Sequence, residues 1–343
     1  MPSENERPIA SNSLFVDFNA SYGLPLRYGA TLTMPVTRDD VVNSYQTFLG
    51  RNPESEDVVS AHMRAQGLDA LHRGFLQSTE FRQKYAMPAD PVPIDLPRNE
   101  VEVEIDSEAL NVLLAHVRRC WEFMGQERPH HSVLTSPNFL PDVLKHNEAD
   151  FWESGEHDAN TLVTILSRYG VTSLSKLSCI DFGCGVGRVT APLAKRFAKV
   201  NAYDISAPHM EIAKSRTLGA DFQLLRELPV IFVQTDVFYS RIVLQHNPPP
   251  IIALLIRSAL NCLNPGGIAV FQVPTYEIGY SFAVRRYLKG VSKAAPDMEM
   301  HCLPQHHIFR IAKEVGCNVL EVREEGSTGR CGSDISNLFV IQR

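Results

Sequence analysis

CIDFGCGVGRV, residues 179–189, places three alternate glycines between an aspartate and an apolar segment. Asp181 lies near the end of a short apolar run, Gly183, Gly185 and Gly187 follow, and VTAPLAKRF then has helical spacing. The pattern predicts a strand, a turn and a helix whose N-terminus directs free amide groups at the turn. Glycine permits positive φ and carries no Cβ, so a ligand can approach its backbone closely. Taken alone, the triplet is also compatible with a tight turn that binds nothing.

Two neighbours of the loop indicate what it binds. Arg188 stands where the third glycine of a dinucleotide-binding GxGxxG turn would be, and a long side chain there interferes with close helix–strand packing. Asp204 ends the next apolar run, where a carboxylate can accept hydrogen bonds from both hydroxyls of a ribose. The loop is therefore predicted to hold a nucleoside without a pyrophosphate. The alternative for Asp204 is a solvated carboxylate at a strand end.

Short apolar runs alternate with helical segments through the second half of the chain. This alternation predicts an α/β fold with a doubly wound, mostly parallel sheet. The last two runs, joined by the glycine-rich EGSTGRCGSD, are predicted to form a hairpin, unlike a pure dinucleotide-binding fold. The predicted strands are 177–182, 200–205, 221–225, 235–244, 267–273, 318–324 and 337–342.

Four pieces in order closely resemble the class I S-adenosylmethionine-dependent methyltransferases. They are DFGCGVGR (181–188), YDIS (203–206), TDVFYSRIVLQHNPP (235–249) and LNPGG (263–267), and the resemblance covers about residues 150–343. It implies S-adenosyl-L-methionine as cofactor and a Rossmann-like, seven-stranded sheet with a C-terminal antiparallel hairpin. In that setting, the glycines let the amino-acid portion of the cofactor lie against the turn.

The resemblance also implies the cofactor-binding residues. Asp181, Gly183 and Gly185 line the methionine portion, and Gly187 lets the following helix start close by. Cys184 is a small side chain that packs within the same loop. Arg188 either pairs with the methionine carboxylate or points outward from the helix surface.

The other cofactor contacts come from the following strands. Asp204 holds the ribose hydroxyls and Ile205 packs on the adenine. Tyr239 and Ser240, at the mouth of the fourth strand, are placed to contact either cofactor or acceptor. The residues after 221–225 match no adenine-gripping motif of these methyltransferases, so the remaining adenine contacts stay unassigned.

Methyl transfer from a sulfonium is an in-line displacement, which depends on holding the acceptor near the methyl group. A hydroxyl acceptor is helped by a general base, for which histidine is suited. His246, in the VLQHNPPP loop, is the first catalytic candidate; the alternative is that it caps the helix starting near Pro250. His301, in MEMHCLPQHH, is the second, because a Met-His stretch occurs at this place in related methyltransferases. No histidine cluster has convincing metal-ligand spacing.

Two further segments are candidates for ligand contact. WESGEHD, residues 152–158, resembles a segment that closes over the cofactor, with Ser154 and Gly155 at the methionine end; an ordinary helix cap is the alternative. YEIGYSFAVRRYLKG, residues 276–290, carries aromatics and cations that suit a sugar or an anionic acceptor, or else forms a surface helix.

The first part of the chain has a different character. Residues 1–34 are predicted to be a polar extension, 35–88 a helical module, 89–130 a linker and helix, and 131–343 the methyltransferase domain. FLGRNPESE and GFLQSTEFR resemble the bacterial family of unknown function numbered 4214 over about residues 37–85. That family brings no catalytic residues, so the module is predicted to serve packing or docking to a protein partner.

Composition limits the class of protein. With 33 Lys and Arg against 39 Asp and Glu, the net charge of −6 argues against a general nucleic-acid binder. Seven cysteines without metal spacing indicate free thiols in a reducing compartment, and the N-terminus lacks a signal-peptide pattern, which predicts a cytoplasmic protein. The longest apolar run, 251–263, contains Arg257, so membrane insertion is not expected.

The resemblance thus predicts an enzyme that methylates a small-molecule or glycan acceptor, most plausibly at oxygen. The alternative is a catalytically inactive scaffold that acts through its helical module. An NAD-dependent enzyme is disfavoured by Arg188 and by the terminal hairpin.

Overall fold

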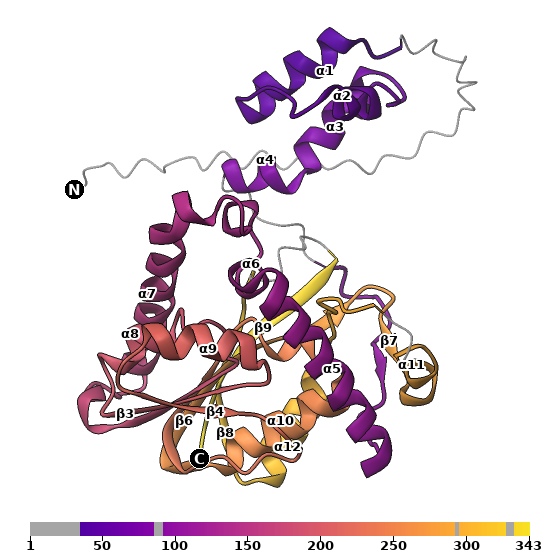
Figure 1. The fold of residues 1–343 in the computed structure, drawn as a ribbon. Coiled ribbons are helices and arrows are strands. Elements are labelled where there is room, and N and C mark those ends of the chain that lie inside the picture. Colours follow the sequence, from indigo (N-terminus) through magenta and orange to yellow (C-terminus); the bar gives the residue numbers. More distant parts are fainter. Residues whose placement is uncertain (1–34, 86–91, 292–294, 327–332) are drawn as a thin grey trace, which may run out of the picture. The chain divides into compact units, whose positions relative to one another are not determined.

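The computed structural model describes residues 35–85, 92–291, 295–326 and 333–343, which fall into two compact units, Met1–Ala86 and Met87–Arg343 (Figure 1). The predicted extension, residues 1–34, lies outside the described residues. Within the described ranges, every helix is too short or too polar to cross a bilayer. Each unit is treated by itself below.

The described part of the first unit is helical. Its helices are α1 (Arg38–Ser44), continuing into the π-helical turn η1 (Tyr45–Leu49), then α2 (Glu56–His62), α3 (Leu68–Gln77) and α4 (Thr79–Lys84). Thr37 caps α1 in a capping box with Asp40, and Ser55 caps α2 by accepting from the Val58 N–H. Gly50, at φ +68°, ends η1.

One ion pair joins the stretches FLGRNPESE and GFLQSTEFR of this unit. Arg51 of FLGRNPESE donates to both carboxylate oxygens of Glu80 of GFLQSTEFR, at 2.6 and 2.7 Å. Such a bidentate pair fixes geometry more firmly than a single contact does. The unit has its own apolar core, made of Val36, Val41, Tyr45, Leu49, Val59, Leu71 and Phe75.

The second unit is built on a mostly parallel sheet of seven strands, in the order β4-β3-β2-β5-β6-β9-β8. Only β9 is antiparallel to its neighbours, lying between β6 and β8, which confirms the α/β class and the terminal hairpin. The strands are β2 (Ser178–Phe182), β3 (Lys199–Asp204), β4 (Ala220–Leu224), β5 (Thr235–Ser240), β6 (Leu263–Glu277), β8 (Asn318–Glu324) and β9 (Asp334–Gln342).

Helices cover both faces of this sheet (Figure 1). In β6, Ala269 and Phe271 pack in one core and Ile268 and Val270 in the other, the alternation expected of a strand buried on both sides. The first core includes α5 (Ser107–Glu127), α10 (Pro249–Asn261) and α12 (Gln305–Glu314). The second includes α7 (Leu144–Arg168) and α8 (Thr190–Ala194).

Helix α5 is part of the core of the second unit. Leu110, Leu113, Leu114 and Val117 of this helix are buried against the sheet. The compact unit therefore includes the segment predicted to be a linker and helix outside the catalytic domain. The remaining helices are α6 (Pro129–Val133), α9 (Ala207–Arg216) and α11 (Val284–Val291), with short 3₁₀ turns η2 (Pro137–Phe139), η3 (Leu174–Lys176) and η4 (Leu244–His246).

Helix α7 runs unbroken for 25 residues through WESGEHD, so the interpretation of that segment as a helix cap is wrong. Gly155 is needed there for packing: a Cβ at this position would lie 2.0 Å from the carbonyl oxygen of Arg188. The glycine lets α7 approach the backbone that follows the β2 loop.

A second, two-stranded sheet fastens the start of this unit to the region before α11. β1 (Glu100–Val101) pairs in parallel with β7 (Ser281–Phe282). The Asn99 side chain donates to the carbonyls of Glu277 and Tyr280, at 2.7 and 3.0 Å. Residues 99–101 therefore support the segment predicted to meet the acceptor.

Candidate functional site

The turn after β2 has the conformation that its glycines require. Gly183, Gly185 and Gly187 have φ values of +76°, +54° and +83°, which side-chain-bearing residues rarely adopt. The N–H groups of Gly183 and Cys184 both donate to the Tyr203 carbonyl of β3, at 2.8 and 3.0 Å. The turn is thereby held at the carboxyl end of the sheet.

The space beside each glycine is also restricted. A Cβ at Gly183 would lie 2.3 Å from the Val243 side chain, and one at Gly185 would lie 2.6 Å from that of Val133. At Gly187 the neighbours are Ala213 and Thr217 of the α9 region, both at 3.1 Å. Gly187 therefore provides close packing against α9 and is absent from the pocket wall described next.

A pocket opens beyond the carboxyl ends of β2, β3 and β5, the place where ligands bind in open α/β sheets. Its empty volume is about 910 Å³, including space open to solvent. Eight of the predicted cofactor residues line it: Asp181, Gly183, Cys184, Gly185, Arg188, Asp204, Ile205 and Tyr239. Ser240 is buried but does not line the pocket, and neither Ser154 nor Gly155 does.

Asp204 is fixed by backbone donors. Its two carboxylate oxygens accept from the N–H groups of Gly185 and Ser206, at 2.7 and 2.8 Å. Each oxygen keeps a further lone pair, so the carboxylate can still accept from two hydroxyls of a ligand. The side chain is buried yet lines the pocket, which excludes the solvated alternative.

Asp181 is a buried carboxyl group with one close donor. The Thr190 hydroxyl donates to its Oδ2 at 2.6 Å. Burial raises the pKa of Asp181 to about 6, although Thr190 and Arg188 oppose the rise. The folded state thus disfavours the charged carboxylate of Asp181.

This raised pKa gives a testable dependence of stability on pH. Because the folded pKa lies above the unfolded one, the contribution of Asp181 is greatest below pH 4 and is lost as pH rises through 6, in total roughly 3 kcal/mol. Denaturant unfolding of Asp181→Asn should therefore show a variant that gains stability relative to the parent protein between pH 4 and 7. A constant difference across that range would contradict the assignment.

Arg188 is buried and does not point outward, so its surface alternative is wrong. Its guanidinium donates to Asp158 at 2.6 Å and to the Ser154 hydroxyl at 3.1 Å, both on α7. Its Nε has no partner, and the residue lines the pocket. Arg241, which follows β5, also pairs with Asp158. Arg241 pairs with Glu325 as well, at 2.7 Å, so two guanidinium groups and two carboxylates form one ion-pair cluster at this end of the pocket.

Ile242, on the pocket wall, has a strained backbone. Its φ of +58° is exceptional for a β-branched residue, and the Gln272 side chain holds the conformation by accepting from the Ile242 N–H at 2.9 Å. Strain of this kind amounts to about 1–3 kcal/mol and tends to concentrate at functional sites.

His246 lies on the pocket wall, in η4. Its Nδ1 is 2.9 Å from the Glu299 carbonyl oxygen, which can only accept, so Nδ1 carries the proton and Nε2 keeps its lone pair. The N-cap of α10 is Pro248, without a side-chain cap, so the interpretation of His246 as a cap is wrong. Burial lowers the pKa of His246 to about 4 and keeps the ring neutral near pH 7.

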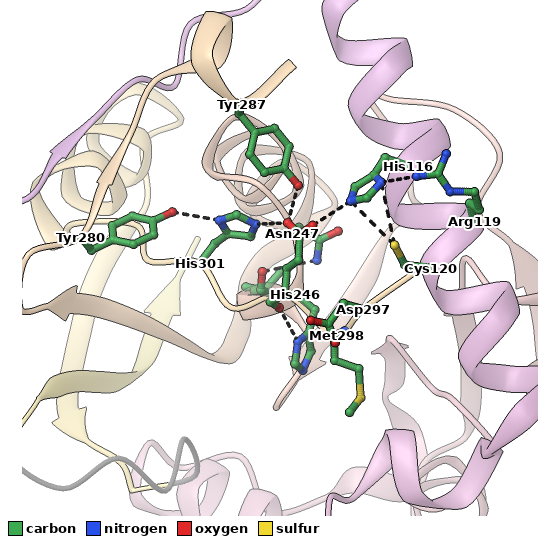
Figure 2. A network of polar contacts seen from close by, with 12 residues as sticks. His116, Arg119, Cys120, His246, Asn247, Tyr280, Tyr287, Asp297, Met298 and His301 are labelled. Atoms are coloured by element: carbon green, nitrogen blue, oxygen red, sulfur yellow. Dashed lines mark hydrogen bonds and ion pairs between the residues drawn. The ribbon is translucent and has the colours of Figure 1, made fainter. Parts of the chain in front are cut away.

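His301 lies behind the wall and not on it. Its Nδ1 faces the Tyr280 hydroxyl at 2.9 Å and its Nε2 faces Oε2 of Glu299 at 3.1 Å (Figure 2). Neither this pocket nor a smaller neighbouring cavity is lined by His301. Its placement therefore does not support the prediction that it contacts the reacting groups.

The smaller cavity adjoins the pocket across His246 and Trp121, which line both. Its empty volume is about 200 Å³, including open space. Its wall combines aromatic rings with carboxylates, from Trp121, Tyr287, Asp297 and Glu299 among others. Within the described ranges, no group of histidine, cysteine and acidic side chains is arranged to hold a metal ion.

Sequence reasoning missed the pocket residues that come from outside the β-strand loops. Val117 and Trp121 of α5 and Ser132 and Val133 of α6 complete the wall. The signal in the sequence was the amphipathic pattern of residues 107–121. Its apolar face had to be buried against another element of the fold. Nothing in the sequence of α6 indicated a role in the site.

The family model described as "Methyltransferase domain" matches residues 153–322. Magnesium protoporphyrin IX methyltransferase from Synechocystis PCC 6803 with bound SAH is similar in structure, with 18% identity and a TM-score of 0.47 over 67% of this chain and 99% of that one. The N-methyltransferase NodS from Bradyrhizobium japonicum WM9, with S-adenosyl-L-homocysteine, gives 14% and 0.41 over 65% and 98%. No curated protein sequence matches the chain.

Proposed function

Given that the chain is an S-adenosylmethionine-dependent methyltransferase, we propose that it methylates a hydroxyl group of a small-molecule or glycan acceptor. The observation that carries the proposal is one pocket that joins the glycine turn, the Asp204 carboxylate and the neutral His246 ring. When bound, the cofactor supplies a methyl group on a sulfonium, which an acceptor oxygen can attack in line.

The described residues fit this cofactor. The glycine turn leaves backbone without Cβ atoms at the pocket, Asp204 offers two acceptor oxygens for the ribose, and Ile205 with Leu225 offers apolar surface for the adenine. The unpartnered Nε of Arg188 is a buried charged donor on a residue that lines the pocket, suited to the methionine carboxylate.

His246 is the group placed to receive the proton of the acceptor. Because Nδ1 already donates to the Glu299 carbonyl, Nε2 keeps its lone pair, and the contact of that lone pair with the Gln245 side-chain amide is a long one of 3.4 Å. A pKa of about 4 makes this ring a weak base, but an oxygen that has gained a methyl group becomes a far stronger acid than an imidazolium. Proton transfer to His246 is then downhill. Methylation of a neutral amine needs no such base, so a base at this place favours oxygen as the methylated atom.

Replacing His246 by glutamine should lower turnover about 10²- to 10⁴-fold, the usual range for a general base. The affinity for S-adenosylhomocysteine should stay nearly unchanged, because the ring lies on the acceptor side in this proposal. Turnover of the parent enzyme should show no titration of His246 between pH 5.5 and 8, since the ring is already neutral there. A variant that retains the parent rate would refute the role of His246 as base.

Calorimetric titration with S-adenosylhomocysteine, with NAD as control, tests the cofactor site directly. Binding of the former alone supports the proposal and justifies a screen of hydroxylated metabolites and glycans as acceptors. Binding of neither would favour a scaffold that has lost its cofactor.

The proposal also covers the cellular environment of the protein and the role of its helical module. Cys120, Cys179, Cys184, Cys262 and Cys317 are buried free thiols, in keeping with a reducing, cytoplasmic environment. We expect residues 35–85 to dock a protein partner, because the sequence of this module offers no catalytic constellation. A partner captured by the intact chain, and lost when the Arg51–Glu80 pair is removed, would support that role.

A further inference from the structure

The Glu299 carboxylate is held by three side chains from different parts of the enzyme (Figure 2). His116 of α5 lies 2.9 Å from Oε1 through its Nε2. Oε2 faces both Nε2 of His301, at 3.1 Å, and the hydroxyl of Tyr287 of α11. Burial by itself would raise the pKa of Glu299, but these donors outweigh it and hold the value at about 2.

The two histidines are themselves oriented. Arg119 donates to Nδ1 of His116 at 2.9 Å; a guanidinium has no acceptor, so Nε2 of His116 carries the proton that points at Glu299. The Tyr280 hydroxyl stands 2.9 Å from Nδ1 of His301; it can donate or accept, so it holds the ring in place. The ionised Glu299 carboxylate, which only accepts, selects the Nε2–H of His301. The carboxylate is therefore surrounded by donors whose directions are already set.

The main chain of the same segment reaches the site. The Glu299 carbonyl accepts from Nδ1–H of His246, and the N–H of His301 donates to the Gln245 carbonyl at 2.7 Å. Residues 299–301 are thus fastened at two points to residues 245–246. The side chain of Glu299 fixes this segment on one side, and its carbonyl meets the His246 ring on the other.

We infer that Glu299 is a positioning residue, which through its anchored backbone holds His246 in the Nδ1–H tautomer with Nε2 available to the pocket. The opposite tautomer would place the lone pair of Nδ1 against the carbonyl oxygen and leave a buried acceptor unsatisfied. His301, Tyr287 and His116 act one step further back, by holding the carboxylate. The inference rests on the proposed role of His246 as base.

The tautomer can be observed in the intact protein by ¹⁵N NMR with labelled histidine. His246→Gln assigns the His246 signals by their disappearance. In the parent protein at pH 7, Nδ1 of His246 should give a protonated, pyrrole-type resonance and Nε2 an unprotonated, pyridine-type resonance. An Nε2–H tautomer in the parent protein would overturn the inference.

Glu299→Gln is the informative variant, because an amide of the same shape cannot accept all three donors. We expect its His246 resonances to move toward the average of the two tautomers, while Glu108→Gln leaves them in place. Glu108 is an exposed residue of α5 that lines neither cavity, so that control matches the change in charge without touching the three donors. If Glu299→Gln does not fold, Tyr287→Phe removes one donor and should give a smaller shift in the same direction.

An unchanged tautomer in a folded Glu299→Gln or Tyr287→Phe variant would refute the positioning role. Binding of S-adenosylhomocysteine and turnover of His246→Gln report separately on the proposed function. A protein that binds the cofactor product and needs His246, yet keeps its tautomer without Glu299, would lose only this inference. Failure of cofactor binding or of the need for His246 would remove the proposed function instead.

Discussion

Replacing Gly155 by alanine should destabilise the catalytic unit, although Gly155 lies inside a long helix where alanine is normally preferred by about 1 kcal/mol. The new Cβ would lie 2.0 Å from the Arg188 carbonyl oxygen. That oxygen cannot move freely, because the Arg188 side chain is held by Asp158 and Ser154. Overpacking against a fixed backbone should exceed the gain in helix propensity, for a net loss of about 2–3 kcal/mol.

Denaturant unfolding measures this loss, and the chain offers a matched control. Gly290 lies in α11 of the same unit with nothing within 4 Å of its missing Cβ. Gly290→Ala should therefore be neutral or stabilising by up to about 1 kcal/mol. Equal effects of the two substitutions would show that α7 has no close contact with the Arg188 backbone. Because Arg188 lines the pocket, Gly155→Ala should also weaken binding of S-adenosylhomocysteine.

Replacing Asp204 should produce the largest loss of cofactor affinity. Two charge-assisted hydrogen bonds to a ribose contribute about 1.5–3 kcal/mol each, so Asp204→Ala should bind S-adenosylhomocysteine at least about 100-fold more weakly. The same substitution also removes the acceptor of the Gly185 and Ser206 N–H groups. A lower melting temperature of the free protein is expected alongside the weaker binding.

Asp204→Asn separates these two effects, because one oxygen is kept. We expect about 10-fold weaker binding with a smaller change in melting temperature, measured by calorimetry on both variants. Asp221→Asn, at an exposed position on β4, is the control for the loss of a negative charge. Unchanged affinity in the folded Asp204→Asn and Asp204→Ala variants would refute the ribose assignment.

Most of the sheet could be predicted because its strands are short apolar runs separated by clear turns. The predicted strands 177–182 and 200–205 correspond closely to β2 (Ser178–Phe182) and β3 (Lys199–Asp204). A strand buried on both faces is a nearly continuous apolar run, so it can be recognised without knowing what packs against it. The position of the pocket followed, since loops at the carboxyl ends of neighbouring parallel strands must meet.

The errors concern features that depend on tertiary contact. Gly155 looked like a helix boundary because a glycine in a helix is unfavourable by itself, and only the nearby Arg188 backbone explains it. The two histidine candidates could not be ranked from sequence, because only the folded chain shows that His246 lines the pocket and His301 does not. The contribution of α5 to the pocket wall was missed, because the sequence does not show which element its apolar face packs against.

The place of β9 in the sheet has a consequence for how this enzyme is made. β9 lies between β6 and β8, although it follows both in the chain. During translation, β6 therefore leaves the ribosome before the strand that pairs with one of its edges. That edge of a largely buried strand stays unpaired until residues 334–342 have been translated. Exposed apolar edges of this kind pair readily with other chains. A nascent chain stalled before residue 334 should therefore depend on chaperones, whereas the released protein closes its own sheet.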